Sequence, residues 1–148
     1  MKKSMNILLI SCFVILFFNI GLLNIRGVEH TAVNADNPGE KIELKKYLEK
    51  NKTNIIDFYS EFCPPCVRIA PFLTKLDEKN EDLVVIKIDI NRKGVKGIDW
   101  KSPIAQQFDL KSIPHFKIFN EKGEKVFEGR EALTMLIEYF KKAGIELK

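Results

Sequence analysis

The stretch from Asn54 to Arg68 constrains the fold most, because a strand pattern there runs directly into a Cys-x-x-Cys pair that opens a helix. The residues before the pair are β-branched or aromatic, as in a buried strand: Ile55, Ile56, Phe58 and Tyr59. After the pair, apolar residues recur at the spacing of one helix face: Ile69, Phe72, Leu73 and Leu76. Two cysteines at the start of a helix, on the rim of a sheet, indicate a redox site.

Cys63 and Cys66 are placed as thiol exchange requires. Unpaired backbone N–H groups and the positive end of the helix dipole favour an anion at Cys63, which increases the fraction of thiolate, the species that attacks disulfides. Cys66, one turn into the helix, is suited to resolving a mixed disulfide. Pro64 and Pro65 have no N–H to donate, so the N–H of Cys66 must supply more of the stabilisation. The geometry imposed by Pro65 predicts that the regular helix starts at that residue.

A Cys-x-x-Cys pair can also be a structural disulfide, half of a zinc site or an inert remnant. A pair so close in sequence closes almost no loop, so it cannot stabilise the fold as a long-range disulfide would. Zinc requires three or four protein ligands, and His115 is the only other candidate downstream of the N-terminal segment. Redox chemistry is therefore the favoured hypothesis.

The length of 148 residues favours one domain with a hydrophobic core. The net charge of +4 includes +2 from residues 1–35, where Lys2, Lys3 and Arg26 oppose Glu29, which leaves +2 downstream. Such a small and evenly mixed charge argues against a nucleic-acid partner.

Residues 1–35 have the pattern of a targeting segment, either a cleaved signal peptide or a retained N-terminal membrane anchor. Two lysines precede residues 7–23, a mostly apolar run of 17 uncharged residues. This run is longer than most signal-peptide cores and near the lower limit of a transmembrane helix, about 17–25 residues. Val33-Asn34-Ala35 offers small residues for cleavage. Both alternatives place residues 36–148 outside the cytoplasm, in a bacterial periplasm or on the outer face of the cytoplasmic membrane.

Downstream, the pattern predicts alternating strands and helices. After a linker and helix entry at 36–39, we expect a charged surface helix that ends near Asn51, with Leu44, Tyr47 and Leu48 on its buried side. Pro71 is expected to interrupt and kink the helix that follows the cysteines. The later elements are a strand at 83–90, a loop at 92–101, a short helix at 103–108, a hairpin with strands at 115–120 and 125–128, and a last helix that stops at Gly144. Two βα units, a hairpin and a closing helix predict an α/β fold, with a mixed central sheet and helices on both faces.

Several motifs, in this order and spacing, resemble the thioredoxin family. They are the stretch from Asp57 to Cys66, then Ile69-Ala70-Pro71, Lys87-Ile88-Asp89, Ser112-Ile113-Pro114 and Gly123. The similarity covers nearly everything from about residue 40 to the end, and it implies a thioredoxin fold for the domain at 36–148.

The resemblance implies roles for four residues. Cys63 is similar to the attacking cysteine of the family, and Cys66 to the resolving cysteine. Asp57 matches the buried acid that relays a proton for the second thiol, and Lys87 matches its cationic partner. Without the resemblance, Asp57 would be read as an edge residue or a locally paired one, and Lys87 as a lysine whose ammonium reaches the sheet rim.

The resemblance also implies a substrate surface formed by Phe62, Pro64, Ile113 and Pro114. Pro114 matches the family's cis-proline beside the active site, where the backbone of Ile113 would pair with an extended substrate. The chain departs from the family at two of these positions, because Phe62 replaces the usual Trp and Pro64 the usual Gly.

Three further features keep alternatives open. The loop from Arg92 to Lys101, which contains Trp100, is longer than in ordinary thioredoxins; it either shapes a partner surface or caps the sheet edge. His115 either modulates the thiolate or is a satisfied strand histidine. The family's first short strand has no obvious counterpart before Glu40.

Together these features predict an exported thiol–disulfide oxidoreductase that reduces protein or peptide disulfides through Cys63 and Cys66. It would need no metal and no cofactor beyond this redox-active disulfide. Because the surroundings oxidise thiols, it would need an electron donor, expected to be a membrane-borne thiol protein. The alternatives are an oxidase or isomerase on the same fold, and a non-catalytic binding module that uses the sheet face and the Trp100 loop.

Overall fold

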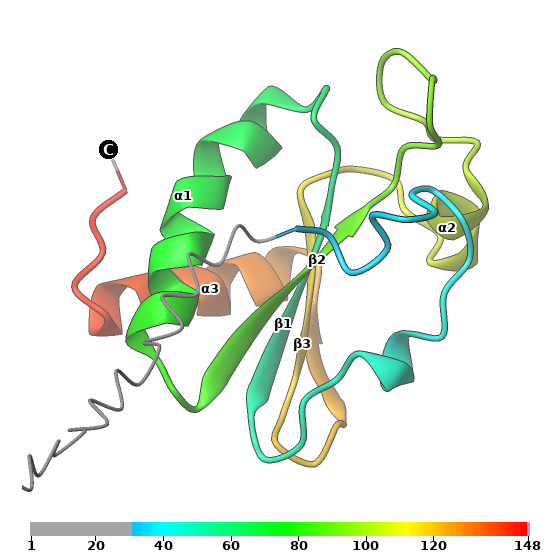
Figure 1. The fold of residues 1–148 in the computed structure, drawn as a ribbon. Coiled ribbons are helices and arrows are strands. Elements are labelled where there is room, and N and C mark those ends of the chain that lie inside the picture. Colours follow the sequence, from blue (N-terminus) through cyan, green and yellow to red (C-terminus); the bar gives the residue numbers. More distant parts are fainter. Residues whose placement is uncertain (1–30, 148) are drawn as a thin grey trace, which may run out of the picture.

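The computed structural model describes residues 31–147, so most of the predicted signal peptide or anchor at residues 1–35, including its apolar run at 7–23, lies outside the described part of the chain. Four strands form one sheet in the order β2-β1-β3-β4 (Figure 1). In chain order the elements are η1 (Leu44–Lys46), β1 (Thr53–Tyr59), α1 (Pro64–Lys79), β2 (Leu83–Asp89), α2 (Pro103–Gln107), β3 (His115–Phe119), β4 (Lys125–Glu128) and α3 (Arg130–Lys142). Between residues 31 and 147, no helix combines the length and the apolar character needed to span a membrane.

The sheet is mixed, as the sequence predicts. β1 pairs in parallel with β2, to which α1 connects it, and β3 pairs antiparallel with both β1 and β4. Because the carboxyl ends of parallel strands meet at one edge of a sheet, the turn that carries the cysteines and the loop after β2 lie at the same end of the molecule (Figure 1).

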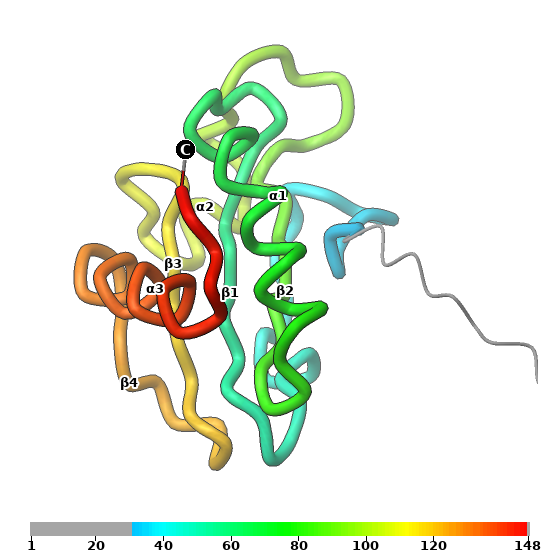
Figure 2. Tube along the Cα trace, turned by 90° about the vertical axis from the view of Figure 1, so that its left-hand side faces the viewer, coloured from blue at the N-terminus to red at the C-terminus, as the bar shows by residue number. Residues whose placement is uncertain are grey.

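Helices cover both faces of the sheet, and each face has its own apolar core. On one face, α1 and α3 pack over a cluster of buried residues that includes Ile55, Leu73, Phe116, Leu136 and Phe140. On the other face, α2 contributes Ile104 and Ala105 to a second cluster with Ile56, Phe58, Ile86 and Ile88. Both helices lie to the left of the strands in Figure 1, and in Figure 2, which views the molecule from that side, α1 and α3 lie in front of the strands. The predicted α/β fold with helices on both faces is confirmed.

The predicted surface helix that ends near Asn51 is wrong, since only the short 3-10 helix η1 forms before that residue. The side chain of Asn54 explains why no helix continues through Glu49. Its Oδ1 accepts from the N–H of Glu49 at 2.7 Å and its Nδ2 donates to the carbonyl of Glu49 at 2.9 Å. These bonds take the backbone groups of Glu49 away from a helical ladder.

The predicted interruption at Pro71 is also wrong, because α1 is continuous from Pro64 to Lys79. Pro71 is exposed, and so is Val67, whose carbonyl loses its helical donor when a proline stands four residues later. Water can satisfy that carbonyl, so the helix continues.

Residues 31–39, here named the strap, run along the free edge of β2. The backbone N–H of Val33 donates to the carbonyl of Lys87 at 2.9 Å, and that of Gly39 donates to the carbonyl of Asp89 at 3.1 Å. The Asn34 side chain donates to the Asp89 carbonyl at 2.8 Å and accepts from the Asp89 N–H at 3.0 Å. No strand precedes β1 in the described residues, in line with the sequence expectation.

The loop from Arg92 to Lys101 is held by its own polar side chains. Arg92 Nε donates to Asp99 Oδ2 at 2.7 Å, and Asn91 Nδ2 donates to the carbonyl of Gly97 at 2.5 Å. Lys93 Nζ reaches the carbonyl of Asp36 in the strap at 2.8 Å. The loop therefore packs beside the strap at the β2 edge, and Trp100 remains 41% exposed.

Candidate active site

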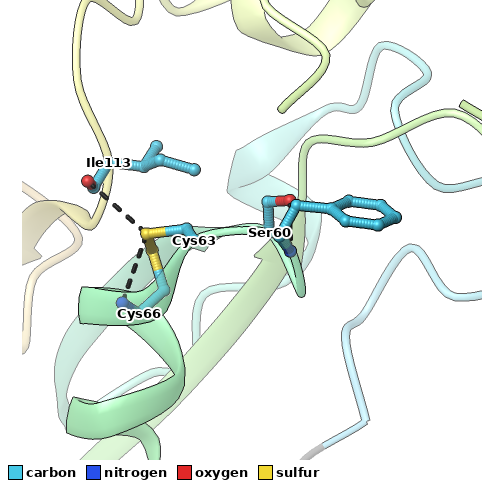
Figure 3. Close-up of a disulfide and its surroundings, with 5 residues drawn as sticks. Ser60, Cys63, Cys66 and Ile113 are labelled. Carbon is cyan, nitrogen blue, oxygen red and sulfur yellow. Dashed lines mark hydrogen bonds between the residues drawn. A yellow bond between two sulfur atoms is a disulfide. The ribbon is translucent and has the colours of Figure 1, made fainter. Parts of the chain in front are cut away.

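The two cysteines lie where β1 turns into α1, at the carboxyl end of the central parallel pair. They form a disulfide, and both are almost completely buried, at 1% and 2% exposure (Figure 3). Cys63 is the N-cap of α1, and the N–H of Cys66 donates to Cys63 Sγ at 3.2 Å. This bond is the one expected from the sequence, because neither intervening proline has an N–H to donate.

The first turn of α1 starts one residue earlier than predicted, at Pro64 rather than Pro65. Two local bonds set this start: the N–H of Cys63 donates to the carbonyl of Ser60 at 3.1 Å, and the N–H of Phe62 donates to Ser60 Oγ at 3.1 Å. The fixed φ of proline suits the first helical position, so Pro64 begins the helix readily.

Ile113 and Pro114 lie beside the disulfide although they are fifty residues away in sequence. The Ile113–Pro114 peptide bond is cis, as the family resemblance implies. The carbonyl oxygen of Ile113 is 3.6 Å from Cys63 Sγ, as Figure 3 shows. In the dithiol form, a Cys63 thiol at this place could donate to the same oxygen.

The surface around Cys63 is apolar. Phe62 is 39% exposed and Val67 is 55% exposed, and Pro64 and Pro65 between them are also exposed. Phe62 and Pro64, which were predicted to bind substrate, therefore lie at the surface next to a sulfur that is itself recessed.

Asp57 is fully buried in β1, on the face that α1 covers. Neither of its carboxyl oxygens has a hydrogen-bond partner among the described residues. Burial is the main effect and raises its pKa from 3.8 to about 7, while the positive charge of Lys87 acts in the opposite direction. A carboxyl group with this pKa can take up or release a proton near neutral pH.

Lys87 is the direct register partner of Asp57 on β2. Because Asp57 has no hydrogen-bond partner, the two side chains form no salt bridge. The ammonium of Lys87 instead lies 4.4 Å from the centroid of the Tyr59 ring, in a cation–π contact. The fold thus places Lys87 next to Asp57, as predicted. The positive charge of Lys87 lowers the pKa of Asp57 without a direct hydrogen bond between the two side chains.

Tyr59 and Lys87 line a pocket of about 360 Å³ that also contains Cys66. Its other lining residues are Glu61, Val67, Ala70, Pro71 and Thr74. Cys66 therefore borders a space that is connected to solvent.

Sequence reasoning did not include Tyr59 among the site residues. A signal was present, because side chains alternate along a strand and Tyr59, two residues after Asp57, must face the same side. The contact with Lys87 required the register of β1 against β2, which is not readable from the chain alone.

His115 is paired away from the disulfide. Its Nε2 is 3.3 Å from Glu128 Oε1, and Lys117 Nζ is 2.6 Å from the same oxygen. Burial acts to raise the pKa of Glu128, but Lys117, Lys125 and His115 outweigh it and lower the pKa to about 2. This supports the strand-histidine alternative.

Within residues 31–147, no group of three or more His, Cys, Asp or Glu residues is arranged to hold a metal ion.

Comparison with known proteins gives consistent results. A family model described as Thioredoxin matches residues 39–142. The chain is 37% identical over 83 residues to a thioredoxin H-type of Brassica oleracea, which covers 56% of this chain and 59% of that protein. It is 31% identical over 101 residues to thioredoxin 1 of Plasmodium falciparum, covering 66% of this chain and 89% of that protein.

The chain thus spans about three fifths of the length of the Brassica relative but most of the Plasmodium one. Among solved structures, mitochondrial thioredoxin 3 of Saccharomyces cerevisiae in its oxidized form aligns with a TM-score of 0.49 at 27% identity, covering 68% of this chain and 87% of that one. Since the family model matches well over half of the sequence and includes both cysteines, the chain belongs to the thioredoxin family.

Proposed function

We propose that this protein is an exported thiol–disulfide oxidoreductase that reduces disulfides in proteins or peptides. The observation that carries the proposal is the Cys63–Cys66 disulfide at the N-terminus of α1, bordered by the Ile113 carbonyl and an exposed apolar patch. The geometry suits a recessed nucleophile that a partner protein must cover before reaction.

The proposed reaction starts from the dithiol. The thiolate of Cys63 attacks one sulfur of the substrate disulfide, which forms a mixed disulfide and releases the first substrate thiolate. The Cys66 thiol then loses its proton and attacks Cys63 Sγ, which releases the second substrate thiolate and closes the Cys63–Cys66 disulfide. Two electrons pass from the dithiol to the substrate.

Asp57 is proposed to accept the proton of Cys66. Its pKa of about 7 leaves a substantial ionised fraction at neutral pH, which is what a proton acceptor needs. Lys87 is proposed to support that ionised form from β2, because its positive charge favours the carboxylate.

Export and membrane attachment belong to the proposal as well, supported by the basic start and the apolar run at residues 7–23. A reductase outside the cytoplasm is re-oxidised at every turnover, so it must be supplied with electrons. The proposed donor is a membrane-borne thiol protein. No cofactor is proposed besides the disulfide itself.

Trapping of mixed disulfides tests the proposed chemistry. In Cys66→Ser the attacking thiol remains but the resolving thiol is gone, so mixed disulfides with substrate proteins should accumulate. They are measured as reductant-sensitive adducts on non-reducing gels and identified by mass spectrometry.

The matched control is Cys63→Ser, in which the proposed attacking cysteine is lost and Cys66 remains. It should trap at least about tenfold less, because Cys66 lacks the N-cap position and the backbone N–H donor that favour a thiolate at Cys63. If Cys66→Ser traps nothing and the unmodified protein reduces no disulfide, the non-catalytic binding module is the better explanation. Equal trapping by both variants would contradict the assigned roles.

A further inference from the structure

Tyr59 is the last residue of β1, and it faces the same side of the sheet as Asp57. Its ring is half-buried, and the Lys87 ammonium stands 4.4 Å from the ring centroid. Lys87 is the register partner of Asp57, so it is the diagonal neighbour of Tyr59 across the β1–β2 pair. Lys87 therefore contacts the Tyr59 ring and is also the cross-strand neighbour of the buried Asp57.

The position of this ammonium needs an explanation, because the pocket of about 360 Å³ in which it stands opens to solvent. A lysine side chain is long and flexible, and its ammonium is strongly hydrated. Without an attractive contact on the pocket wall, the cation would extend into water. The negative face of the Tyr59 ring supplies such a contact through the cation–π interaction.

We propose that Tyr59 is a positioning residue, whose ring holds the Lys87 ammonium in the pocket beside Cys66 and so keeps the cation near Asp57 without an ion pair. The ring acts on the acid only through the lysine. The nearby positive charge then stabilises the ionised form of Asp57. Because no salt bridge holds the carboxyl group, it can still exchange a proton.

Several other groups face this site. From α1, Cys66 lines the pocket, and from the turn after β1, Glu61 does. Asp89, the register partner of Tyr59, adds a carboxylate on β2. Burial is the main effect that raises the pKa of Tyr59, and the negative charges of Asp89, Asp57 and Glu61 act in the same direction. The β3 partner of Asp57 is the apolar Phe116. Lys87 is thus the cation that opposes the effect of burial on the pKa of Asp57.

The catalytic meaning of the inference rests on the proposed function, but its test does not. The Asp57 carboxyl group can be titrated by carbon-13 NMR in the oxidised full-length chain, where neither cysteine has a proton to lose. A failure of the thiol chemistry would leave this titration unchanged, so the two proposals fail separately.

Four variants make the test: Tyr59→Leu, Tyr59→Phe, Lys87→Gln and the double variant Tyr59→Leu/Lys87→Gln. Loss of the cation in Lys87→Gln should raise the pKa of Asp57. Tyr59→Leu should act in the same direction and increase the ratio of protonated to ionised Asp57 at pH 7 by about twofold or more. Tyr59→Phe keeps the ring face and should leave the titration unchanged.

The double variant distinguishes positioning from a general structural effect. If Tyr59 acts through Lys87, the double variant should titrate like Lys87→Gln alone. The proposal would be overturned if the changes in the Asp57 pKa were additive in the double variant, or if Tyr59→Leu did not change that pKa. A lower Asp57 pKa in Tyr59→Leu would also overturn it, because it would mean that the smaller side chain only admits water. Should Tyr59→Leu fail to fold, Tyr59→Met replaces it with an unbranched apolar side chain and the same expected result.

Discussion

At the scale of single residues, Asp57 is a buried carboxyl group whose desolvation is not compensated by hydrogen bonds from the described residues. It is fully buried, it lies among apolar side chains, and its oxygens have no hydrogen-bond partner. Natural proteins seldom bury a polar group in this way, and those that persist commonly serve function rather than stability. The carboxyl group should therefore reduce the stability of the fold once it is ionised.

We predict that the stability of the oxidised protein falls as the pH rises from about 4 to about 7. The pKa of Asp57 is raised from 3.8 in the unfolded chain to about 7 in the fold, so the folded state binds more protons in this window. The stabilisation is complete below the unfolded pKa and is lost as the pH passes through the folded pKa. At about 1.4 kcal/mol per pKa unit, the full effect is about 4 kcal/mol. Urea denaturation between pH 4 and pH 8 measures it.

Asp57→Asn should remove this pH dependence, because the amide does not titrate. Its overall stability can differ from that of the unmodified chain, so the slope against pH is the quantity to compare. Asp82→Asn, at an exposed position before β2, is the matched control and should keep the slope. A slope that survives in Asp57→Asn would show that another group is responsible.

At the scale of elements, β2 is an edge strand, and the strap closes its free side. An uncovered edge presents unpaired N–H and carbonyl groups to other chains. The side-chain amide of Asn34 takes the place of a neighbouring strand at Asp89, since it donates to the carbonyl of Asp89 and accepts from its N–H. Signal cleavage after Ala35, one of the sequence-based alternatives, would remove this asparagine from the folded domain.

Asn34→Ala is expected to destabilise the fold by about 0.5–1.5 kcal/mol, because the partly buried N–H of Asp89 loses its acceptor. Hydrogen exchange at the Asp89 amide should become faster, and the midpoint of urea denaturation should fall. Asn37→Ala, at an exposed position in the same strap, should change neither. Unchanged exchange at Asp89 in Asn34→Ala would mean that the strap does not protect this edge.

At the scale of the whole molecule, the site is an assembly of segments that are far apart in sequence. The β1–α1 turn supplies the disulfide, the turn before β3 supplies Ile113, and β2 supplies Lys87. Which way electrons flow through such a site depends on the reduction potential of the couple relative to its surroundings.

If the protein is a reductase, the Cys63–Cys66 couple should be more reducing than glutathione. Its potential should lie near that of thioredoxin, about −270 mV, rather than near about −120 mV, where a strong disulfide oxidase lies. Equilibration with defined mixtures of reduced and oxidised glutathione, followed by thiol alkylation and mass spectrometry, gives the value. A potential well on the oxidising side of glutathione would favour the oxidase or isomerase alternative.

Much of the fold was predictable from the sequence because its signals are local. The β-branched strand before Cys63, the helical spacing after Cys66 and the glycines at the turns each specify their own element, and all of these elements form. The surface helix predicted before Asn51 does not form, because the side chain of Asn54 hydrogen-bonds the backbone N–H and carbonyl of Glu49. Asn54 lies outside the apolar spacing from which that helix was predicted.

The sequence by itself determined the cysteine pair, the helix that it caps and the motifs that identify the family, since these depend on residues a few positions apart. Only the tertiary structure decided that the Asp57 carboxyl group has no hydrogen-bond partner among residues 31–147, that the Lys87 ammonium lies against the Tyr59 ring and that Asn34 closes the edge of β2. These contacts depend on strand register and on where the chain returns, and side-chain spacing along one segment does not encode either.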